Sequence, residues 1–256
     1  MGITSISNQN IYRDYQSLSS GKRIHSAADD AAGLAIAEKL ESQVNGYDVG
    51  KRNAGTSQDM PKVADGVLES ITDNLQRIRE LSVQASNGLY TDSDKGAIQA
   101  EIDQLKQAIS DTATQTQFNT KNLLDGTMGS SHVAGGPDAS GMEVEMPNAT
   151  LEALGIADYD VTGDFDLSVI DKALETVNSA RSGLGATSNR LDYMMAYNSN
   201  VSYHTTASQS RIEDLDYPQA VSDLKKKELL TTFSIMMQKK QTENEDGKVM
   251  RLLQRG

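Results

Sequence analysis

The side chains that most often bind metals or carry out acid–base chemistry are few and scattered in this sequence. The three histidines, His25, His132 and His204, lie far apart and form no His-Glu-x-x-His motif, the spacing by which one helix presents two histidines to zinc. Cysteine is absent, which excludes disulfides, thiolate chemistry and cysteine metal sites. The residues therefore predict no metal site, no cofactor and no enzyme.

Two further features resemble chemical motifs but have simpler structural interpretations. Asp29 and Asp30 are adjacent acids, yet they follow Ser26 at the start of an apolar helical pattern, where negative charge is favoured by the helix dipole. Gly183 and Gly185 follow no strand pattern, so they do not predict a phosphate-binding loop. Both features indicate helix architecture rather than a reactive site.

Composition excludes other classes of protein. The 256 residues carry 24 basic and 36 acidic side chains, a formal net charge of −12, and the chain has no Trp, nine Tyr and three Phe. So acidic a chain, without a basic stripe, repels nucleic acid, and so few aromatics predict a thin core. No apolar run approaches the roughly 18–20 residues that cross a bilayer. The start, Met1-Gly-Ile-Thr-Ser, lacks the pattern of a cleavable secretory signal.

The elements that would carry any function are long helices. From Ala31 to about Ser86 the pattern is helical, and its second half has apolar residues at alternating spacings of four and three, a heptad seam. A helix of this length would be roughly 84 Å long, against a radius of gyration of about 18 Å for a globule of this chain length, so we expect a rod. Pro61 lies inside the pattern, and we expect a break near Asp59-Met-Pro. The seam comprises Ala64, Leu68, Ile71, Leu75, Ile78, Ser82 and Ala85.

A second helix is predicted from about Asp92 to Thr116, with Thr91 and Asp94 as its capping pair. The segment 87–90 is too short for anything but a tight reversal, which predicts antiparallel packing on the first helix. The seam of the second helix comprises Ile98, Ile102, Leu105, Ile109 and Thr112.

Periodicity stops after Phe118-Asn119, and residues 125–164 predict a small irregular cap at the end of the rod. Within it Ser131–Ala134 could pair with Met142–Met146 as a hairpin, and Thr150–Leu154 predicts a helical turn. A third long helix is expected from Asp166 or Ser168, interrupted near Pro218 and followed by a last amphipathic helix. The third seam comprises Ile170, Leu174, Val177, Arg181, Leu184, Ser188, Leu191, Met195 and Asn198.

The fold expected from these patterns is mainly α, an elongated antiparallel helical bundle or coiled coil with a small β-hairpin cap and terminal helices. The terminal helices are amphipathic and have no obvious partner except each other. Unpaired amphipathic ends indicate assembly.

The sequence resembles bacterial flagellin in a series of motifs. The N-terminal motifs are Leu18-Ser-Ser-Gly-Lys-Arg-Ile24, Ser26-Ala-Ala-Asp-Asp-Ala-Ala-Gly-Leu-Ala-Ile36 and Leu75-Gln-Arg-Ile-Arg-Glu-Leu-Ser-Val-Gln-Ala-Ser-Asn-Gly88. Gln115-Thr-Gln-Phe-Asn119 and Asn122-Leu-Leu-Asp-Gly126 follow, and then Ser182-Gly-Leu-Gly-Ala186, Asn189-Arg-Leu191 and Ser210-Arg-Ile-Glu-Asp214. The motifs occur in order on the predicted helices, and only about 128–165 lacks one.

The resemblance implies a structural subunit of the flagellar filament, which serves motility. Such a chain would be exported unfolded by the flagellar type III apparatus, with an export chaperone on its C-terminal helix, and would polymerise with other flagellin subunits outside the cell. It implies an inner-core segment at 1–30, an outer bundle at 31–208 with the cap at about 125–164, and an inner-core helix at 209–256. The short middle implies a compact flagellin without large outer domains.

The resemblance also implies recognition by the Toll-like flagellin receptor of animal hosts. The matching positions are Gln76, Arg77, Leu81, Gln84, Ile98 and Glu101. Arginine is a frequent interface anchor, and a glutamate can accept a charge-assisted hydrogen bond. Use of Arg77, Leu81 and Glu101 in contacts between subunits is an equally good interpretation, and both can hold.

Three departures from the family bear on polymerisation. The segment before Leu18-Ser-Ser-Gly is about half the usual length, Pro61 interrupts the first helix pattern, and Lys239–Lys248 is highly charged. Two alternatives stay open, a hook–filament junction or other accessory subunit and, from a different class, a cytosolic coiled-coil signalling or adaptor module. The Leu75–Gly88 and Ser17–Ile36 motifs favour filament flagellin.

Overall fold

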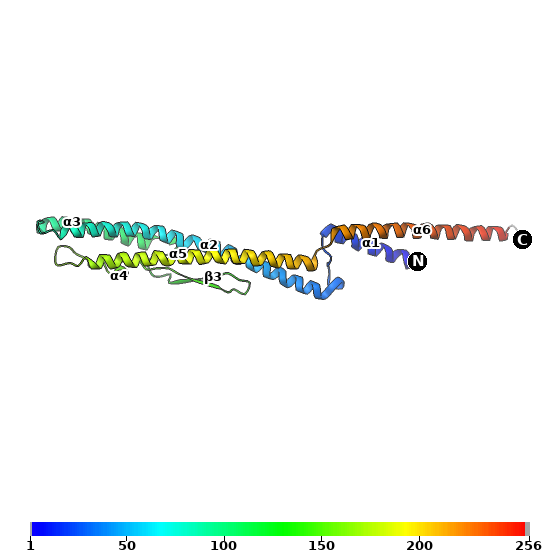
Figure 1. Cartoon of the computed structure of the whole chain (residues 1–256), viewed down its shortest axis with the longest axis horizontal. Helices are drawn as coiled ribbons and strands as arrows, with labels where there is room; N and C mark the ends of the chain where they lie inside the picture. Colours follow the sequence, from blue (N-terminus) through cyan, green and yellow to red (C-terminus); the bar gives the residue numbers. More distant parts are fainter. Residues whose placement is uncertain (1, 254–256) are drawn as a thin grey trace. The chain divides into compact units, whose positions relative to one another are not determined.

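The computed structural model describes the backbone of residues 2–253 and the side chains of residues 11–247. The mainly α fold predicted from the sequence is confirmed (Figure 1). The chain forms two compact units, which we describe separately: unit 1 contains Met1–Ser42 and His204–Gly256, and unit 2 contains Gln43–Tyr203. The helices are α1 (Gly2–Ser20), α2 (Ala27–Ala85), α3 (Asp92–Gln115), α4 (Leu151–Leu154), α5 (Ser168–Glu213) and α6 (Tyr217–Leu253). The strands are β1 (Gln117–Phe118), β2 (Lys121–Asn122), β3 (Ser130–Ala134) and β4 (Gly141–Glu145).

The two adjacent acids at the start of α2 each accept hydrogen bonds from backbone N–H groups. Asp29 Oδ2 accepts from the backbone N of Ser26 at 3.0 Å and holds the first turn. Asp30 has non-helical backbone angles, φ −162° and ψ 95°, and its Oδ1 accepts from the backbone N of Gly33 at 2.8 Å. Asp30 is thus the N-cap of the long helix that continues from Ala31. The kink at Asp30 separates this helix from the first turn.

The break expected at Pro61 was wrong. α2 continues through Pro61, and the only non-helical residue recorded inside it is Asp30. Proline removes one N–H donor and crowds the preceding turn, but Met60 and Ala64 on either side are buried in the core of unit 2. The packing of these neighbours in the core offsets the local cost of proline in a helix. The sequence pattern shows that cost but not the packing, and therefore predicted a break.

Unit 2 is built from three long antiparallel helical segments (Figure 1). α3 folds back on α2, and Thr91 and Asp94 form the predicted capping box at its start. α5 runs antiparallel to α2, since ion pairs join Arg79 to Asp171 and, further along α5, Arg181 to Asp65. A short turn joins α2 to α3, whereas the connection from α3 to α5 contains the four strands and α4. The apolar seams of the three segments form one core.

The core of unit 2 follows the heptad seams closely. Fourteen of the predicted seam residues are at most 2% exposed: Ala64, Leu68, Ile71, Leu75, Ile78, Ser82, Ala85, Ile102, Ile109, Ile170, Val177, Leu184, Leu191 and Asn198. Leu105 and Leu174 are only partly buried against this core. On α5 the fully buried residue at that turn is Ala173, because close packing there admits a methyl group more readily than a leucine side chain.

The hairpin is formed by β3 and β4, which pair antiparallel from Ser130 opposite Glu145 to Ala134 opposite Gly141. Val133, Met142 and Val144 point into the core while the alternate residues of β4 are exposed. The expected position at the end of the bundle was wrong: the hairpin lies along the side of unit 2, where Figure 1 shows it beside α5. The hairpin turn lies against α2 at Gly46 and Gly50 and against α5 at Met194.

Smaller elements complete unit 2. The strands β1 and β2, which the sequence did not indicate, are joined by Asn119 and Thr120 with φ of 47° and 66°, the positive values of a tight hairpin turn. The predicted helical turn is confirmed as α4, capped by Thr150 and ended by Gly155 at φ 71°.

Unit 1 brings α1 against α6. Lys227 Nζ donates to Asp14 Oδ2 at 2.7 Å, and the Tyr15 hydroxyl donates to Glu228 Oε1 at 2.6 Å. Pro218 lies in the first turn of α6, where backbone N–H groups have no partner within the helix. The N–H that proline lacks therefore costs the helix no hydrogen bond. Asp216 caps that turn by accepting from the backbone N of Gln219 at 3.2 Å. The interruption predicted at Pro218 is therefore confirmed as the boundary between α5 and α6.

Candidate assembly and recognition surfaces

Two linkers in unit 1 pair with each other beside the helix ends. Lys22 and Asp214 form an antiparallel β-bridge. The backbone N of Arg23 donates to the Glu213 carbonyl at 2.6 Å, and that of Leu215 donates to the Gly21 carbonyl at 2.9 Å. Gly21, at φ 72°, supplies the left-handed residue that ends α1. We call this pairing the linker clasp; it joins the segments that lead into α2 and out of α5.

An ion pair secures the linker clasp. Lys22 Nζ donates to Glu213 Oε1 at 2.5 Å, and the Glu213 residue is only 6% exposed. The hydrogen bond from Lys22 lowers the pKa of Glu213, and the same bond raises the pKa of Lys22. The buried carboxylate is thereby held in its charged form.

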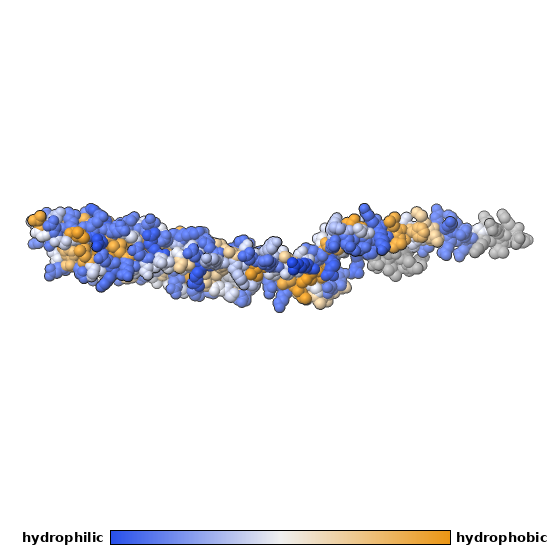
Figure 2. Space-filling view, viewed as in Figure 1, coloured by the Kyte–Doolittle hydropathy of each residue, from blue (hydrophilic) through white to orange (hydrophobic). Residues whose placement is uncertain are grey.

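The α6 helix carries an uncovered apolar face in unit 1. Leu224 is buried, whereas further along α6 large apolar residues are at least 52% exposed. Figure 2 shows orange, hydrophobic surface over this part of α6. The spacing of three and four residues places several of them on one side of the helix, and apolar patches of this kind mark contact sites. The exposed residues are Leu229, Leu230, Phe233, Ile235, Met236 and Met237.

The predicted recognition residues lie where α3 packs on α2. Arg77 is half exposed and donates from Nη2 to Glu101 Oε1 at 2.7 Å and from Nη1 to Glu80 Oε2 at 3.2 Å. The hydrogen bond to Glu101, and then that to Glu80, raises the pKa of Arg77. The guanidinium is therefore held in one orientation at the surface.

The remaining members of the predicted set divide into two groups. Gln76 and Gln84 are exposed, and Gln84 Nε2 donates to the Tyr90 hydroxyl at 2.9 Å. Leu81 and Ile98 are only 2% and 8% exposed and belong to the core of unit 2. The expectation that Leu81 supplies a contact to a partner needs correction, because in this structure its side chain is buried in the core of unit 2. Leu81 and Ile98 support the surface, and Gln76, Arg77, Gln84 and Glu101 form it.

The net charge of the chain lies entirely in unit 2, which the composition of the whole chain does not show. Unit 2 holds 11 Lys and Arg against 23 Asp and Glu, which is the whole formal net charge of −12, whereas unit 1 holds 13 of each. Counting charge by unit requires the unit boundaries, so sequence reasoning missed this asymmetry.

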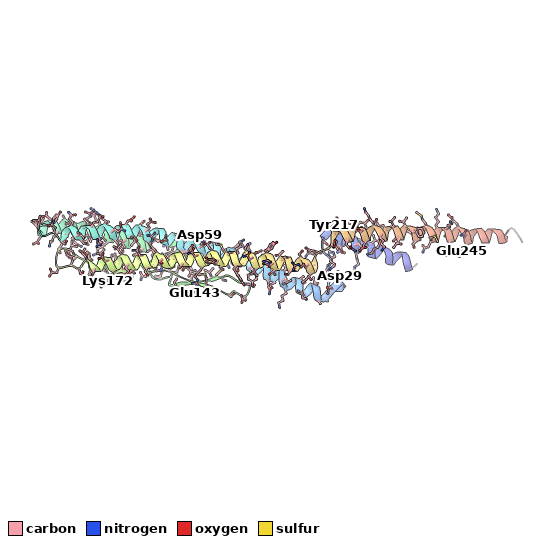
Figure 3. The ribbon with its side chains drawn as sticks, viewed as in Figure 1. Asp29, Asp59, Glu143, Lys172, Tyr217 and Glu245 are labelled. Carbon is pink, nitrogen blue, oxygen red and sulfur yellow. The ribbon has the colours of Figure 1, made fainter. Side chains whose placement is uncertain are left out.

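Several carboxylates of unit 2 serve local turns. Asp125 accepts from the backbone N and hydroxyl of Thr127, and Asp160 accepts from those of Thr162. These hydrogen bonds lower the pKa of both carboxyls. Within the described residues, no three His, Asp or Glu side chains converge as a metal site would require. Figure 3 shows the charged side chains spread along the helices and the hairpin, with Asp59, Glu143 and Lys172 among those labelled.

Over the part of the chain that the structure describes, no helix combines the length and apolar character that a bilayer crossing needs. The long antiparallel helices, the linker clasp and the apolar face on α6 are features of a helical structural protein.

Comparison with known proteins identifies the family. Residues 3–128 match the bacterial flagellin N-terminal helical region, and residues 167–253 match the bacterial flagellin C-terminal helical region. The chain belongs to the bacterial flagellin family.

Relatives match over nearly the whole chain. The flagellar filament core protein flaB2 of Brachyspira hyodysenteriae is 35% identical over 251 residues, which cover 90% of this chain and 88% of that protein. A flagellin of Halalkalibacterium halodurans is 35% identical over 229 residues, covering 87% and 84% of the two chains.

Solved structures support the fold alone. A Bacillus cereus flagellin crystal structure aligns with a TM-score of 0.51 at 24% identity, covering 57% of this chain and 88% of that one. A putative flagellar hook-associated protein from Vibrio parahaemolyticus aligns with a TM-score of 0.60 at 16% identity, covering 73% and 100%.

Proposed function

We propose that this chain is a subunit that polymerises into the bacterial flagellar filament. The relatives named as filament core proteins and flagellins support this function. The observation that carries it within the structure is the exposed apolar face of α6, because large apolar side chains on one helix face are stabilised when another chain buries them. A neutral unit 1 favours the same conclusion, since copies of it can approach without net repulsion.

We assign residues 1–30 and 209–256 to the inner tube of the filament and residues 31–208 to an outer bundle. Folding units and assembly regions need not share borders. The boundaries of the compact units lie at 42/43 and 203/204, inside the proposed outer bundle. The first turns of α2 and the last turns of α5 therefore belong to unit 1 with the terminal helices.

Delivery outside the cell follows from the same proposal. The chain would pass the flagellar type III apparatus unfolded, with a chaperone covering α6 before assembly. The apolar side chains of α6 support this step, because an uncovered face of Leu230, Phe233 and Met237 favours aggregation before subunits meet. A chaperone that binds this helix should therefore lose affinity when Phe233 becomes polar.

Electron microscopy of the full chain tests polymerisation. We expect long filaments from the unaltered protein and none from Phe233→Asp, because the substitution places a charge on a face that must be buried between copies. Gln238→Asp is the matched control, since it adds the same charge on the other side of α6 and should leave filaments intact. Equal polymerisation by both variants, or only short accessory caps from the unaltered chain, would contradict the proposal.

Recognition by a host Toll-like receptor is a second proposed function. The observation that favours it is the exposed guanidinium of Arg77, held by Glu101 and flanked by exposed Gln76 and Gln84. An anchor fixed before binding loses less conformational entropy on contact. A reporter-cell assay with purified monomer tests this function independently of filament formation.

A further inference from the structure

Two tyrosines project from the middle of α5 in unit 2. Tyr193 is 77% exposed and Tyr197 is 60% exposed, and their spacing of four residues places them on one helix face. Ala196 and Asn200 on the same face are also exposed. We call these four residues the Tyr193 surface; it belongs neither to the apolar face of α6 nor to the surface around Arg77.

Neighbouring elements hold this surface in shape. The ring of Tyr197 meets that of Tyr47 on α2 edge-on, with centroids 6.4 Å apart. A hollow of about 480 Å³ opens beside them, lined by Tyr47, Met194, Tyr197 and the hairpin turn. The buried Asn198 anchors that turn by donating from Nδ2 to the Gly135 carbonyl at 2.7 Å. The shape of the Tyr193 surface is therefore set by α2, α5 and the hairpin, and it is already formed in the single chain.

The Tyr193 surface lies in the part of α5 with the least charge. Residues 191–203 contain a single charged residue, Asp192, whose Oδ1 accepts from Gln58 Nε2 at 2.6 Å. On the adjoining part of α2, Lys51 donates to Ser199 and Asp48 accepts from Ser202, so one charge of each sign flanks the surface. The rest of unit 2 carries a large negative excess.

This charge distribution favours the Tyr193 surface as the place where a second copy of unit 2 makes contact. Two copies of unit 2 repel each other wherever acidic faces approach within a Debye length of about 8–10 Å, so contact is least costly through a charge-poor face. Tyrosines offer large contact area with few rotatable bonds and are enriched in interfaces. A projecting ring beside a hollow also suits a head-to-tail contact, which continues from copy to copy without closing.

We infer that the Tyr193 surface is a lateral contact between unit 2 and a second copy of this chain. The inference rests on the proposed polymerisation and adds to it the place where the acidic units meet. Tyr193 is the centre of the contact, Tyr197 and Tyr47 form its rigid base, and the hollow beside the hairpin turn receives a side chain of the neighbouring copy.

Because the chain contains no cysteine, single introduced thiols report on this surface. Tyr193→Cys and, as a control, Gln104→Cys on the exposed face of α3 should react equally fast with a maleimide in the monomer. In filaments we expect the thiol at 193 to react at least tenfold more slowly and the thiol at 104 to keep its monomer rate. Circular dichroism checks that both variants fold.

The outcomes separate the inference from the function on which it rests. If the unaltered chain forms no filaments, the proposed function fails and the lateral contact fails with it. If filaments form and the thiols at 193 and 104 stay equally reactive, the lateral contact alone is overturned. Folded Tyr193→Cys monomers that no longer polymerise, while Gln104→Cys monomers do, would support the contact.

Discussion

Lys22 and Glu213, which are 191 residues apart in the sequence, form an ion pair at 2.5 Å across the linker clasp of unit 1. The carboxylate is nearly buried, while the lysine reaches it from the solvent side. Backbone hydrogen bonds of Arg23 and Leu215 flank the pair on the two linkers. The paired charges therefore act together with these backbone bonds, and with the bond from Arg23 Nη2 to the Ile212 carbonyl, in holding the clasp closed.

Acid should open the linker clasp. The folded-state pKa of Glu213 is lowered, so its contribution is present above the unfolded carboxyl pKa of about 4.3 and is lost as pH falls through the lowered value. At neutral pH, Glu213→Gln should weaken the clasp by on the order of 1 kcal/mol. Amide hydrogen exchange of Arg23 and Leu215 measures this weakening. Both amides should exchange faster in Glu213→Gln, and the difference from the unaltered chain should vanish in strong acid. Glu38→Gln, at an exposed position of α2, serves as the control.

A methyl group at Gly50 should disturb the hairpin turn. A Cβ added there would lie 2.2 Å from the Gly135 carbonyl oxygen, so Gly50→Ala forces the turn away and should cost about 1–3 kcal/mol. Gly66→Ala is the matched control in the same helix, because nothing lies within 4 Å of its added Cβ. That change should stabilise by about 0.5–1 kcal/mol. Denaturant melts compare the two, and equal effects would contradict the close approach.

The α5 seam should respond to truncation according to burial. Leu191 is 0% exposed, so Leu191→Ala should destabilise unit 2 by about 2–5 kcal/mol. Leu174 is only partly buried against the core, and Leu174→Ala should cost clearly less. Chemical denaturation followed by circular dichroism gives both values. A larger loss of stability at Leu174 than at Leu191 would contradict this ranking by burial and would place Leu174 in the core, as the heptad pattern predicts.

Receptor signalling should distinguish two arginines that are similarly exposed. Arg77 pairs with Glu101, whereas Arg79 pairs with Asp171 of α5 and lies on another side of α2. Arg77→Ala should lower reporter activation by about tenfold, the effect of a modest interface anchor, and Arg79→Ala should leave it unchanged. Equal responses from the two variants would remove Arg77 from the proposed recognition surface.

Local sequence signals predicted the elements well and their tertiary placement less well. Thr91 and Asp94 act within one turn, so the start of α3 was predictable from four residues. The continuity of α2 at Pro61 depends on the burial of Met60 and Ala64, which no local propensity contains. The side position of the hairpin depends on glycines in α2 that admit its turn, a relation between distant segments.

The candidate surfaces show the same division. The family resemblance assigned both Arg77 and Leu81 to one recognition surface, and the structure leaves Arg77 half exposed whereas Leu81 is buried. Periodicity on α5 favoured Leu174 over Ala173, because a heptad pattern weighs residue type and not the space available between helices. The unequal charge of the two units became visible only when the structure assigned each residue to a unit.

The long-range pairs also set the order in which the chain folds. Arg181 reaches back 116 residues to Asp65, and Lys227 reaches back 213 residues to Asp14. Closing loops of this size is slow, because chain entropy is lost before the contacts form. α2 therefore completes its packing only when α5 is present, and α1 only when α6 is present. If the chain is exported as proposed, whichever end leaves the export channel first has to wait unpaired for the other end.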